Sequence, residues 1–140
     1  MGAIFRITVD PSTHMVRQYL AGFFEAADVE RFVEARNAAH EQLTCGPNEH
    51  VTLVDVRDMK IQPQDIVQAF GSVLADPRYR SRKLAFVFAL SLARMQLLRA
   101  AAGRNARLFN NEEDAQAWLL SENDEAENPA SSDEARLRIA

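Results

Sequence analysis

One run of the sequence, residues 84–90, constrains the fold more than any other. Its seven residues, LAFVFAL, are apolar on both alternating sets. A strand built from them must be covered on both faces, which is typical of the mostly parallel sheets of α/β proteins. The rest of the chain agrees, because strand-like and helix-like segments alternate along it. Strands are predicted at 4–9, 14–20, 51–56, 84–90 and 106–109, and helices at 27–43, 63–76 and 91–102 and after Asn110.

The order of these elements is ββαβαβαβα, and it decides how the strands pair. Three strand–helix–strand units imply parallel neighbours joined by right-handed crossovers. The two N-terminal strands are separated only by the turn at residues 10–13 and predict an antiparallel hairpin. We therefore expect one α/β domain over residues 1–120, built on a mixed, mostly parallel sheet.

Charge divides the chain unevenly. Residues 121–140 hold six acids and two arginines and no apolar periodicity, which predicts an acidic, disordered tail. Residues 77–111 hold eight basic residues and no acid. One interpretation is a solvated face that keeps the protein in solution; the other is a surface for an anionic partner or a membrane, with which the tail competes. The residues expected on that surface are Arg78, Arg80, Arg82, Lys83 and Arg94.

The sequence carries no recognisable catalytic, metal or cofactor signature. The five glycines are isolated and form no phosphate-binding loop. His14, His40 and His50 have no further ligand at metal spacing, so neither a metal nor a cofactor is expected. Cys45 cannot form an internal disulfide, which fits a reducing cytoplasm, and we expect a bystander thiol there rather than a nucleophile.

Targeting and nucleic-acid signals are weak as well. The N-terminus shows no secretory pattern, and no apolar run approaches the length of a membrane span. Nucleic acid is not expected as a partner, since Tyr79 is the one aromatic residue interleaved with the arginines of the basic run. We expect a cytoplasmic protein, with peripheral membrane contact as an open possibility.

Polar side chains stand where three predicted strands end. Asp55, Arg57 and Asp58 close one strand, Ser91 follows the next and Asn110 follows the last. The carboxyl ends of parallel strands share one edge of a sheet, and ligands of open α/β sheets tend to bind there. These five residues are the predicted ligand- or partner-binding site. Helix capping alone would also explain Ser91 and Asn110.

Two helices carry unusual patterns. Arg36 and His40 fall one turn apart within an apolar stripe, so Arg36 should reach an acid or a carbonyl, and the pair could border a cavity. On the helix at 91–102, the spacing predicts Leu98 on the inward face and Leu97 pointing elsewhere. With Arg94 nearby, that second face could meet a protein or an anionic membrane.

The segment VTLVDVRD (51–58), the arginine-rich DPRYR (76–80) and the ending ARLF (106–109) through AWL (117–119) together resemble the SpoIIAA-like branch of the STAS-related domains. The resemblance covers residues 4–120. It implies a right-handed β/α superhelix, shared with lipid-carrying CRAL-TRIO-type domains, and a non-enzymatic regulatory, protein-binding or ligand-binding role. Membrane association is suggested for some members.

The anti-sigma-factor antagonists that name the class carry a phosphorylated serine after this strand. Here Asp55 is followed by Val56, Arg57, Asp58 and Met59, with no hydroxyl to modify, so the same switch is not expected. The preferred hypothesis is a non-enzymatic module that binds a ligand or partner at the strand ends. A membrane-peripheral module for lipid or another small hydrophobic ligand is the first alternative, and a small enzyme using Asp55, Asp58 or Cys45 the second. The oligomeric state is open, although an uncovered sheet edge could pair.

Overall fold

A computed structural model describes residues 2–89, 91–101 and 105–122. Its centre is a five-stranded sheet with the strands in chain order. The strands are β1 (Ile4–Asp10), β2 (Met15–Gly22), β3 (Val51–Met59), β4 (Lys83–Val87) and β5 (Ala106–Phe109). β1 runs antiparallel to β2, and the other neighbouring pairs are parallel. The predicted mixed, mostly parallel sheet with an N-terminal hairpin is confirmed. Of the acidic tail predicted at 121–140, residues 123–140 lie outside the described residues.

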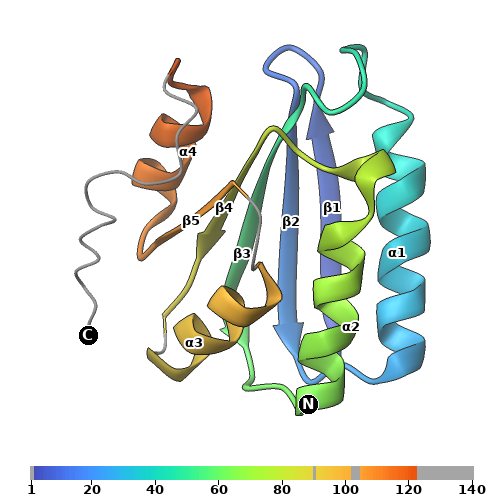
Figure 1. Cartoon of the computed structure of the whole chain (residues 1–140), viewed down its shortest axis with the longest axis vertical. Helices are drawn as coiled ribbons and strands as arrows, with labels where there is room; N and C mark the ends of the chain where they lie inside the picture. The colour runs from blue at the N-terminus through green and yellow to red at the C-terminus, as the bar shows by residue number, and fades with distance from the viewer. Residues whose placement is uncertain (1, 90, 102–104, 123–140) are drawn as a thin grey trace.

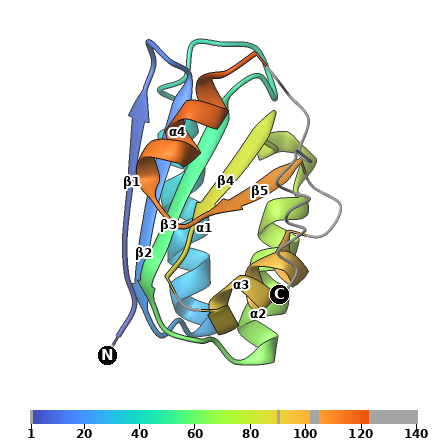
Figure 2. The same ribbon diagram turned by 90° about the vertical axis from the view of Figure 1, so that its left-hand side faces the viewer.

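Helices cover the two faces of the sheet unequally (Figures 1 and 2). One layer is formed by α1 (Ala26–His40), α2 (Gln64–Ala75) and α3 (Ser91–Ala100). The opposite face carries α4 (Glu112–Leu120), which packs on β3, β4 and β5. A short 3-10 turn, η1 (Pro77–Tyr79), joins α2 to β4. Within the described residues, no helix combines the length and the apolar character that crossing a bilayer requires.

The alternation of β3 explains the two cores. Val54 and Val56 point toward α1 and α2, whereas Val51 and Leu53 point toward α4. All five residues of β4 are buried, as the apolar run predicted, because helices cover this strand from both sides. Trp118 of α4 is buried in the second core.

On its side of the sheet α4 packs on β3, β4 and β5 and reaches the start of β2 at Met15 and Arg17, so that among the described residues β1 and the rest of β2 are left open (Figure 2). That open face carries polar side chains, among them Arg6 and Thr8 of β1 and Tyr19 of β2. The opposite side of the same strands is apolar and packs under α1. The sheet is therefore closed on the α1 side and polar on the other side at its β1 edge.

The start of α4 differs from the prediction. Asn111, not Asn110, caps this helix: the Asn111 side chain accepts a hydrogen bond from the Asp114 amide at 2.8 Å. Asn110 still belongs to the connection that leaves β5. The backbone of Asn111 is extended, as a cap requires, so the helix begins one residue later than the sequence pattern suggested.

Lys83 does not lie on the predicted basic surface. Its side chain is fully buried, and Nζ donates to the carbonyl oxygens of Trp118, at 2.8 Å, and Ser121, at 2.9 Å. Those carbonyls belong to the end of α4, where helical hydrogen bonding runs out and a cation is favoured. Lys83 therefore holds α4 on the sheet. Arg78 and Arg82 are exposed.

Arg80, the third arginine expected on this surface, is exposed as well. The side chain of Arg94 lies outside the described part of the chain. An anionic partner or a membrane surface at these arginines stays a prediction.

Candidate functional site

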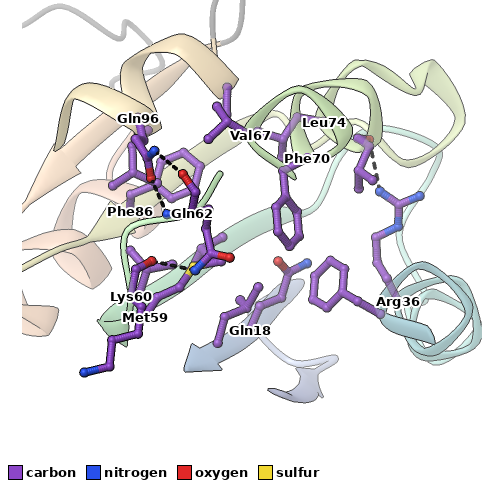
Figure 3. Close-up of a pocket in the computed structure, with 17 residues that line it drawn as sticks. Gln18, Arg36, Met59, Lys60, Gln62, Val67, Phe70, Leu74, Phe86 and Gln96 are labelled. Carbon is purple, nitrogen blue, oxygen red and sulfur yellow. Dashed lines mark hydrogen bonds between the residues drawn. The ribbon is translucent and has the colours of Figure 1, made fainter. Parts of the chain in front are cut away.

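A cavity of about 90 Å³ lies between the sheet and the layer of α1, α2 and α3 (Figure 3). The strands β2, β3 and β4 supply its floor through residues such as Leu20, Val54 and Phe86. The helices supply its roof, including Val67 of α2 and Leu97 of α3. Most of the lining is apolar, so the cavity is a suitable space for an apolar molecule.

Aromatic rings form one wall of this cavity. Phe32 of α1 and Phe70 of α2 meet edge to face, with ring centroids 5.9 Å apart. Phe70 also meets Phe24 at 5.4 Å, and Phe32 meets Phe5 of β1 at 5.5 Å. Edge-to-face contacts of this kind fix ring orientation as well as burying area. The wall is therefore a connected aromatic cluster that ties α1 and α2 to the sheet.

Gln18 is the unexpected residue of the cavity floor. It sits on β2 between Val16 and Leu20, on the apolar side of the strand, with 8% of its surface exposed. Its amide points into the cavity toward the ring of Phe70 (Figure 3). No hydrogen bond joins that amide to any residue that the structure describes. A buried amide without a partner is destabilising by roughly 1–3 kcal/mol.

The other buried glutamine of the cavity, Gln62, is fully bonded. Its Oε1 accepts from the Phe24 amide at 2.9 Å, and its Nε2 donates to the carbonyls of Gly22, at 2.9 Å, and Lys60. Its backbone pairs with the Gln96 side chain of α3, through N to Oε1 at 3.0 Å and O to Nε2 at 2.7 Å. These bonds tie together the chain after β2, the chain after β3, and α3.

Arg36 closes the cavity at the α1 side. Its side chain is buried, donates to the Val73 carbonyl at 3.2 Å and lies 4.0 Å from the Asp76 carboxylate. Burial lowers the pKa of Arg36, and the nearby Asp76 opposes that shift. The guanidinium also lies over the Tyr79 ring, 4.5 Å from its centroid. The expectation that Arg36 reaches a carbonyl and an acid is confirmed.

His40 lies one turn further along α1 and does not line the cavity; its ring packs against that of His50 with centroids 4.6 Å apart. Burial, with smaller contributions from His50 and Arg36, lowers the pKa of His40 to about 4. His40 is therefore neutral in the folded protein near pH 7. Of the two residues expected to border a cavity, only Arg36 does so.

The inward face of α3 is the reverse of the predicted one. Leu97 lines the cavity and Ala101, four residues later, joins the same core, whereas 48% of Leu98 is exposed. Residues four apart share a helix face, and the packing of α3 beside α2 selects the Leu97 face. The spacing within α3 predicted the Leu98 face, and the packing against the neighbouring helix overrides it.

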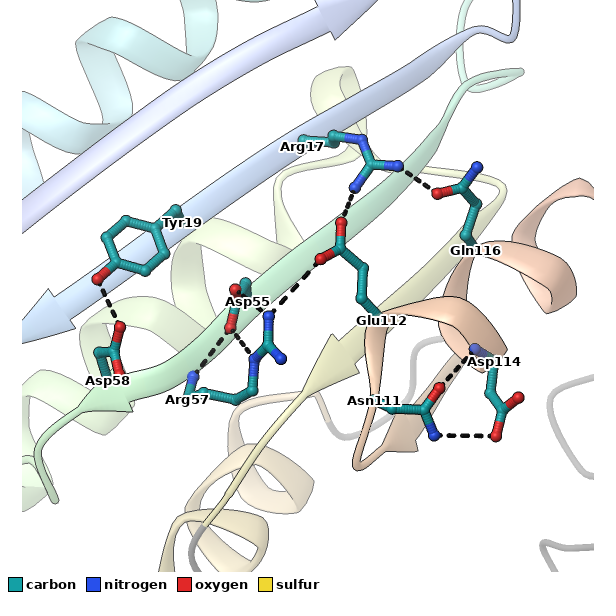
Figure 4. A network of polar contacts seen from close by, with 9 residues as sticks. All are labelled: Arg17, Tyr19, Asp55, Arg57, Asp58, Asn111, Glu112, Asp114 and Gln116. Atoms are coloured by element: carbon teal, nitrogen blue, oxygen red, sulfur yellow. Dashed lines mark hydrogen bonds and ion pairs between the residues drawn. The ribbon is translucent and has the colours of Figure 1, made fainter.

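The predicted residues Asp55 and Arg57 come together on the other face of the sheet, beside α4 (Figure 4). Arg57 donates to both carboxylate oxygens of Asp55, at 3.0 and 2.8 Å. The same guanidinium lies 3.6 Å from the Glu112 carboxylate at the start of α4. Arg17 of β2 binds Glu112 and Gln116. The network joins β2, β3 and α4.

The electrostatics of this network favour the ionised forms. Partial burial raises the pKa of Asp55, but the hydrogen bonds from Arg57 outweigh it, and the net pKa lies below the usual value. Asp58 accepts a hydrogen bond from the Tyr19 hydroxyl at 2.7 Å, which together with burial raises the pKa of Tyr19. Arg6 lies over the Tyr19 ring at 4.4 Å. These charges are already paired with one another.

The strand ends share one edge of the sheet, as expected. Asp55 is in register with Val87, and Val87 with Phe109, which directly precedes Asn110. Ser91 begins α3, so the chain after β4 leaves this edge into the α1–α3 layer, whereas the chain after β5 leaves it to α4 on the opposite face. The side chain of Ser91 lies outside the described residues.

Binding by the five residues predicted at this edge stays a prediction. Sequence reasoning missed the two residues that link the edge to its surroundings, Arg17 and Glu112. It also missed Gln18 and Gln62 of the cavity. For Gln18 the signal was present, since it interrupts an alternating apolar set.

Comparison with known proteins identifies the fold. The chain resembles a solved structure from Shewanella loihica PV-4, an uncharacterised protein of the DUF3478 family with a SpoIIAA-like fold. The TM-score is 0.62, with 16% sequence identity over 84% of this chain and 94% of that one. The fold is SpoIIAA-like. The sequence matches no family model and, at a significant level, no curated protein.

The expected resemblance is thus confirmed at the level of architecture. The SpoIIAA-like fold places an apolar cavity under one helix layer and a paired polar network on the other face. At 16% identity the likeness carries the fold and no specific activity. The cavity and the polar network are therefore the two candidate sites.

Proposed function

We propose that this chain is a non-enzymatic binding module that holds a small, mostly apolar ligand in the cavity between the sheet and α1–α3. The observation that carries the proposal is the unpartnered amide of Gln18 inside a mostly apolar space. A polar group on a ligand would give that amide the hydrogen bond that it lacks. The apolar lining would bury the rest of the molecule.

A ligand fits this site better than water does. A buried water needs two to four polar partners, and cavities without them stay dry. Two other amides line the cavity and are already bonded. The Gln62 amide bonds the backbone of Phe24, Gly22 and Lys60, and the Gln96 amide bonds the backbone of Gln62. Arg36 is directed to Val73 and Asp76. Among the lining amides that the structure describes, Gln18 is the one left available to an occupant.

The lining also favours binding over catalysis. Among the described residues that line the cavity, none carries a carboxylate, an imidazole, a thiol or a hydroxyl. General acid–base or nucleophilic catalysis uses such groups or a lysine amine. The lining lysine, Lys60, extends away from the other lining side chains (Figure 3). The side chains present are apolar, amide or cationic. The cavity therefore has the composition of a binding pocket.

The volume and polarity define the class of ligand. A cavity of roughly 150 Å³ lined by aliphatic and aromatic residues binds benzene, so about 90 Å³ suits a slender molecule of a few carbon atoms. A neutral amide or hydroxyl on a short hydrocarbon chain matches Gln18, which can both donate and accept. Gln18 offers no compensating charge to an ionised end group, and of the cationic lining residues Arg36 is already directed to Asp76.

The test uses an isosteric pair of probes, 1-butanol and n-pentane. Each would be titrated into ¹⁵N-labelled full-length protein, with amide chemical shifts followed at Gln18, Phe70 and Leu97. Both should bind, and Gln18→Met should shift the 1-butanol to n-pentane affinity ratio by about two- to tenfold toward n-pentane, the worth of one hydrogen bond. Leu97→Phe should weaken both probes by filling the cavity. Absence of shifts at these residues, or an unchanged ratio in Gln18→Met, would contradict the proposal.

A membrane-peripheral role is the second candidate, and one observation favours it. Leu98 is 48% exposed on α3, beside the exposed Arg99. An apolar and a basic side chain together suit an anionic membrane surface. Sedimentation with vesicles of anionic or zwitterionic lipid tests it: binding that depends on anionic lipid and falls in Leu98→Gln supports this role. Binding that is independent of lipid charge contradicts it.

A further inference from the structure

β1 forms one edge of the sheet. β1 pairs with β2 through seven consecutive residue pairs without a bulge. Within the described ranges, no strand pairs with its other edge. An edge of this kind presents a row of backbone donors and acceptors, and proteins usually protect it with proline, lysine, a bulge or a covering segment. Residues 4–10 contain neither proline, glycine nor lysine.

The side chains of β1 leave apolar surface along this edge. Phe5, Ile7 and Val9 point under α1 and are only half-buried, although the first two pack against the core. Ile4, on the opposite face, is 46% exposed. A neighbouring strand would cover the remaining apolar surface of Phe5, Ile7 and Val9, because side chains of adjacent strands lie side by side on each face.

The sequence of β1 is complementary to itself. Arg6 and Asp10 stand two residues before and two residues after Thr8, and all three side chains lie on the open face. If two β1 strands pair antiparallel about a two-fold axis at Thr8, each Arg6 lies directly opposite the Asp10 of the other copy. The same register sets Ile7 opposite Val9 twice on the α1 face. Opposite charges and β-branched pairs at such positions both stabilise a sheet.

We propose that two copies of this chain associate through antiparallel pairing of β1 about Thr8, forming one continuous sheet. The interface is isologous, as a two-fold dimer requires. A two-fold axis at Ile7 is less favourable, because it sets Arg6 opposite Thr8 and brings the two copies of Arg6 into diagonal contact. The cavity plays no part in this inference, so the dimer and the ligand can be tested separately.

The first test compares two lysine substitutions by sedimentation equilibrium of the full-length protein. The wild-type chain of 15.7 kDa should sediment at twice this mass. Thr8→Lys brings two like charges together at the axis and should raise the dissociation constant by about tenfold or more. Thr13→Lys adds the same charge in the turn outside the pairing and should leave it unchanged. Circular dichroism checks that both variants are folded.

The second test depends on the register. Arg6→Asp alone places acid against acid, and Asp10→Lys alone places base against base, so each variant should be monomeric. Mixed together they restore two opposite-charge pairs, and a heterodimer should form. Asp10→Lys also removes the hydrogen bonds between Asp10 and Ser12 in the turn. Mixing with Arg6→Asp would not restore those bonds, so a heterodimer would report the β1 pairing itself. A monomeric wild type, a dimer unaffected by Thr8→Lys, or no association on mixing would each overturn the proposed pairing.

Discussion

Replacing Gln18 with methionine should stabilise the ligand-free protein. Methionine keeps the length and approximate shape of glutamine but removes the amide, which lies in an apolar cavity without a partner. Most substitutions of a buried residue destabilise a protein by about 0.5–3 kcal/mol. The opposite sign is expected here, because the native residue is the one that does not suit its surroundings.

The magnitude follows from the desolvation of the amide. A buried amide without a hydrogen bond is unfavourable by roughly 1–3 kcal/mol according to protein substitutions. Gln18 is 8% exposed, but its amide atoms are not among the fully buried ones, so only part of this penalty applies. Partial contact of the amide with the cavity space reduces it, and a gain of about 1–2 kcal/mol in the free energy of unfolding is expected. For a domain of this size that corresponds to about 3–8 °C in Tm.

Gln62→Met is the matched control. Gln62 is 6% exposed, similar to Gln18, but its amide makes hydrogen bonds to three backbone groups, those of Phe24, Gly22 and Lys60. The same substitution there leaves buried backbone donors and acceptors unpaired, and it should lower the free energy of unfolding by about 2–4 kcal/mol. Two glutamines of similar burial should thus change the free energy of unfolding in opposite directions, because only Gln62 is hydrogen-bonded.

Urea unfolding followed by circular dichroism measures both variants, after native mass spectrometry has shown that no small molecule is retained. Addition of 1-butanol should then raise the stability of the wild type more than that of Gln18→Met, because the ligand binds only the folded state. If Gln18→Met destabilises the ligand-free protein by 1 kcal/mol or more, the amide has a structural partner. The proposed binding of a ligand at Gln18 would then be refuted.

Three further predictions test contacts elsewhere in the fold. Asn111→Ala should lower the free energy of unfolding by about 1 kcal/mol through loss of the α4 cap. Asn110→Ala should change it by less than about 0.5 kcal/mol. Equal effects of the two variants in urea unfolding would contradict the assigned cap. Lys83→Met should destabilise by about 1–3 kcal/mol, because the end of α4 loses a charged donor; unchanged urea stability would show that α4 is held by apolar contacts alone. His40 has a pKa of about 4 in the folded protein and 6.5 in the unfolded chain, so the folded protein binds fewer protons there. Its contribution to the free energy of unfolding is therefore present above pH 6.5 and lost as the pH falls toward 4. His40→Gln should flatten stability in that window, and an unchanged slope would assign the loss to other groups.

The architecture was predictable because its signals are local. The buried strand β4 follows from an apolar run, and the parallel order follows from alternating strands and helices. Even the hairpin of β1 and β2 is visible in the turn that joins them. Element boundaries were less predictable: β3 continues to Met59 and β4 ends at Val87, because pairing with neighbours, not the sequence of one strand, sets where a ladder stops.

The side-chain environments were predictable only where one element decides them. Arg36 in an apolar stripe had to find a carbonyl or an acid, and it did. Lys83 looked like part of a basic surface because the arginines around it are near in sequence. Its true partner, the end of α4, lies 35 residues further along the chain. Leu97 and Leu98 could not be ordered without knowing that α3 packs beside α2.

Gln18 shows how a departure from a pattern can indicate function. Its position between Val16 and Leu20 favours an apolar residue on every local criterion: strand alternation, burial and the neighbouring rings. Elsewhere in the cavity the same residue type is used for structure, since Gln62 joins three chain segments. Gln18 joins none of the described segments, so the fold gains nothing from its amide. A residue that lowers stability where an apolar one would raise it is expected at a functional site. This favours the cavity, over the paired charges at the strand ends, as the site of the proposed ligand.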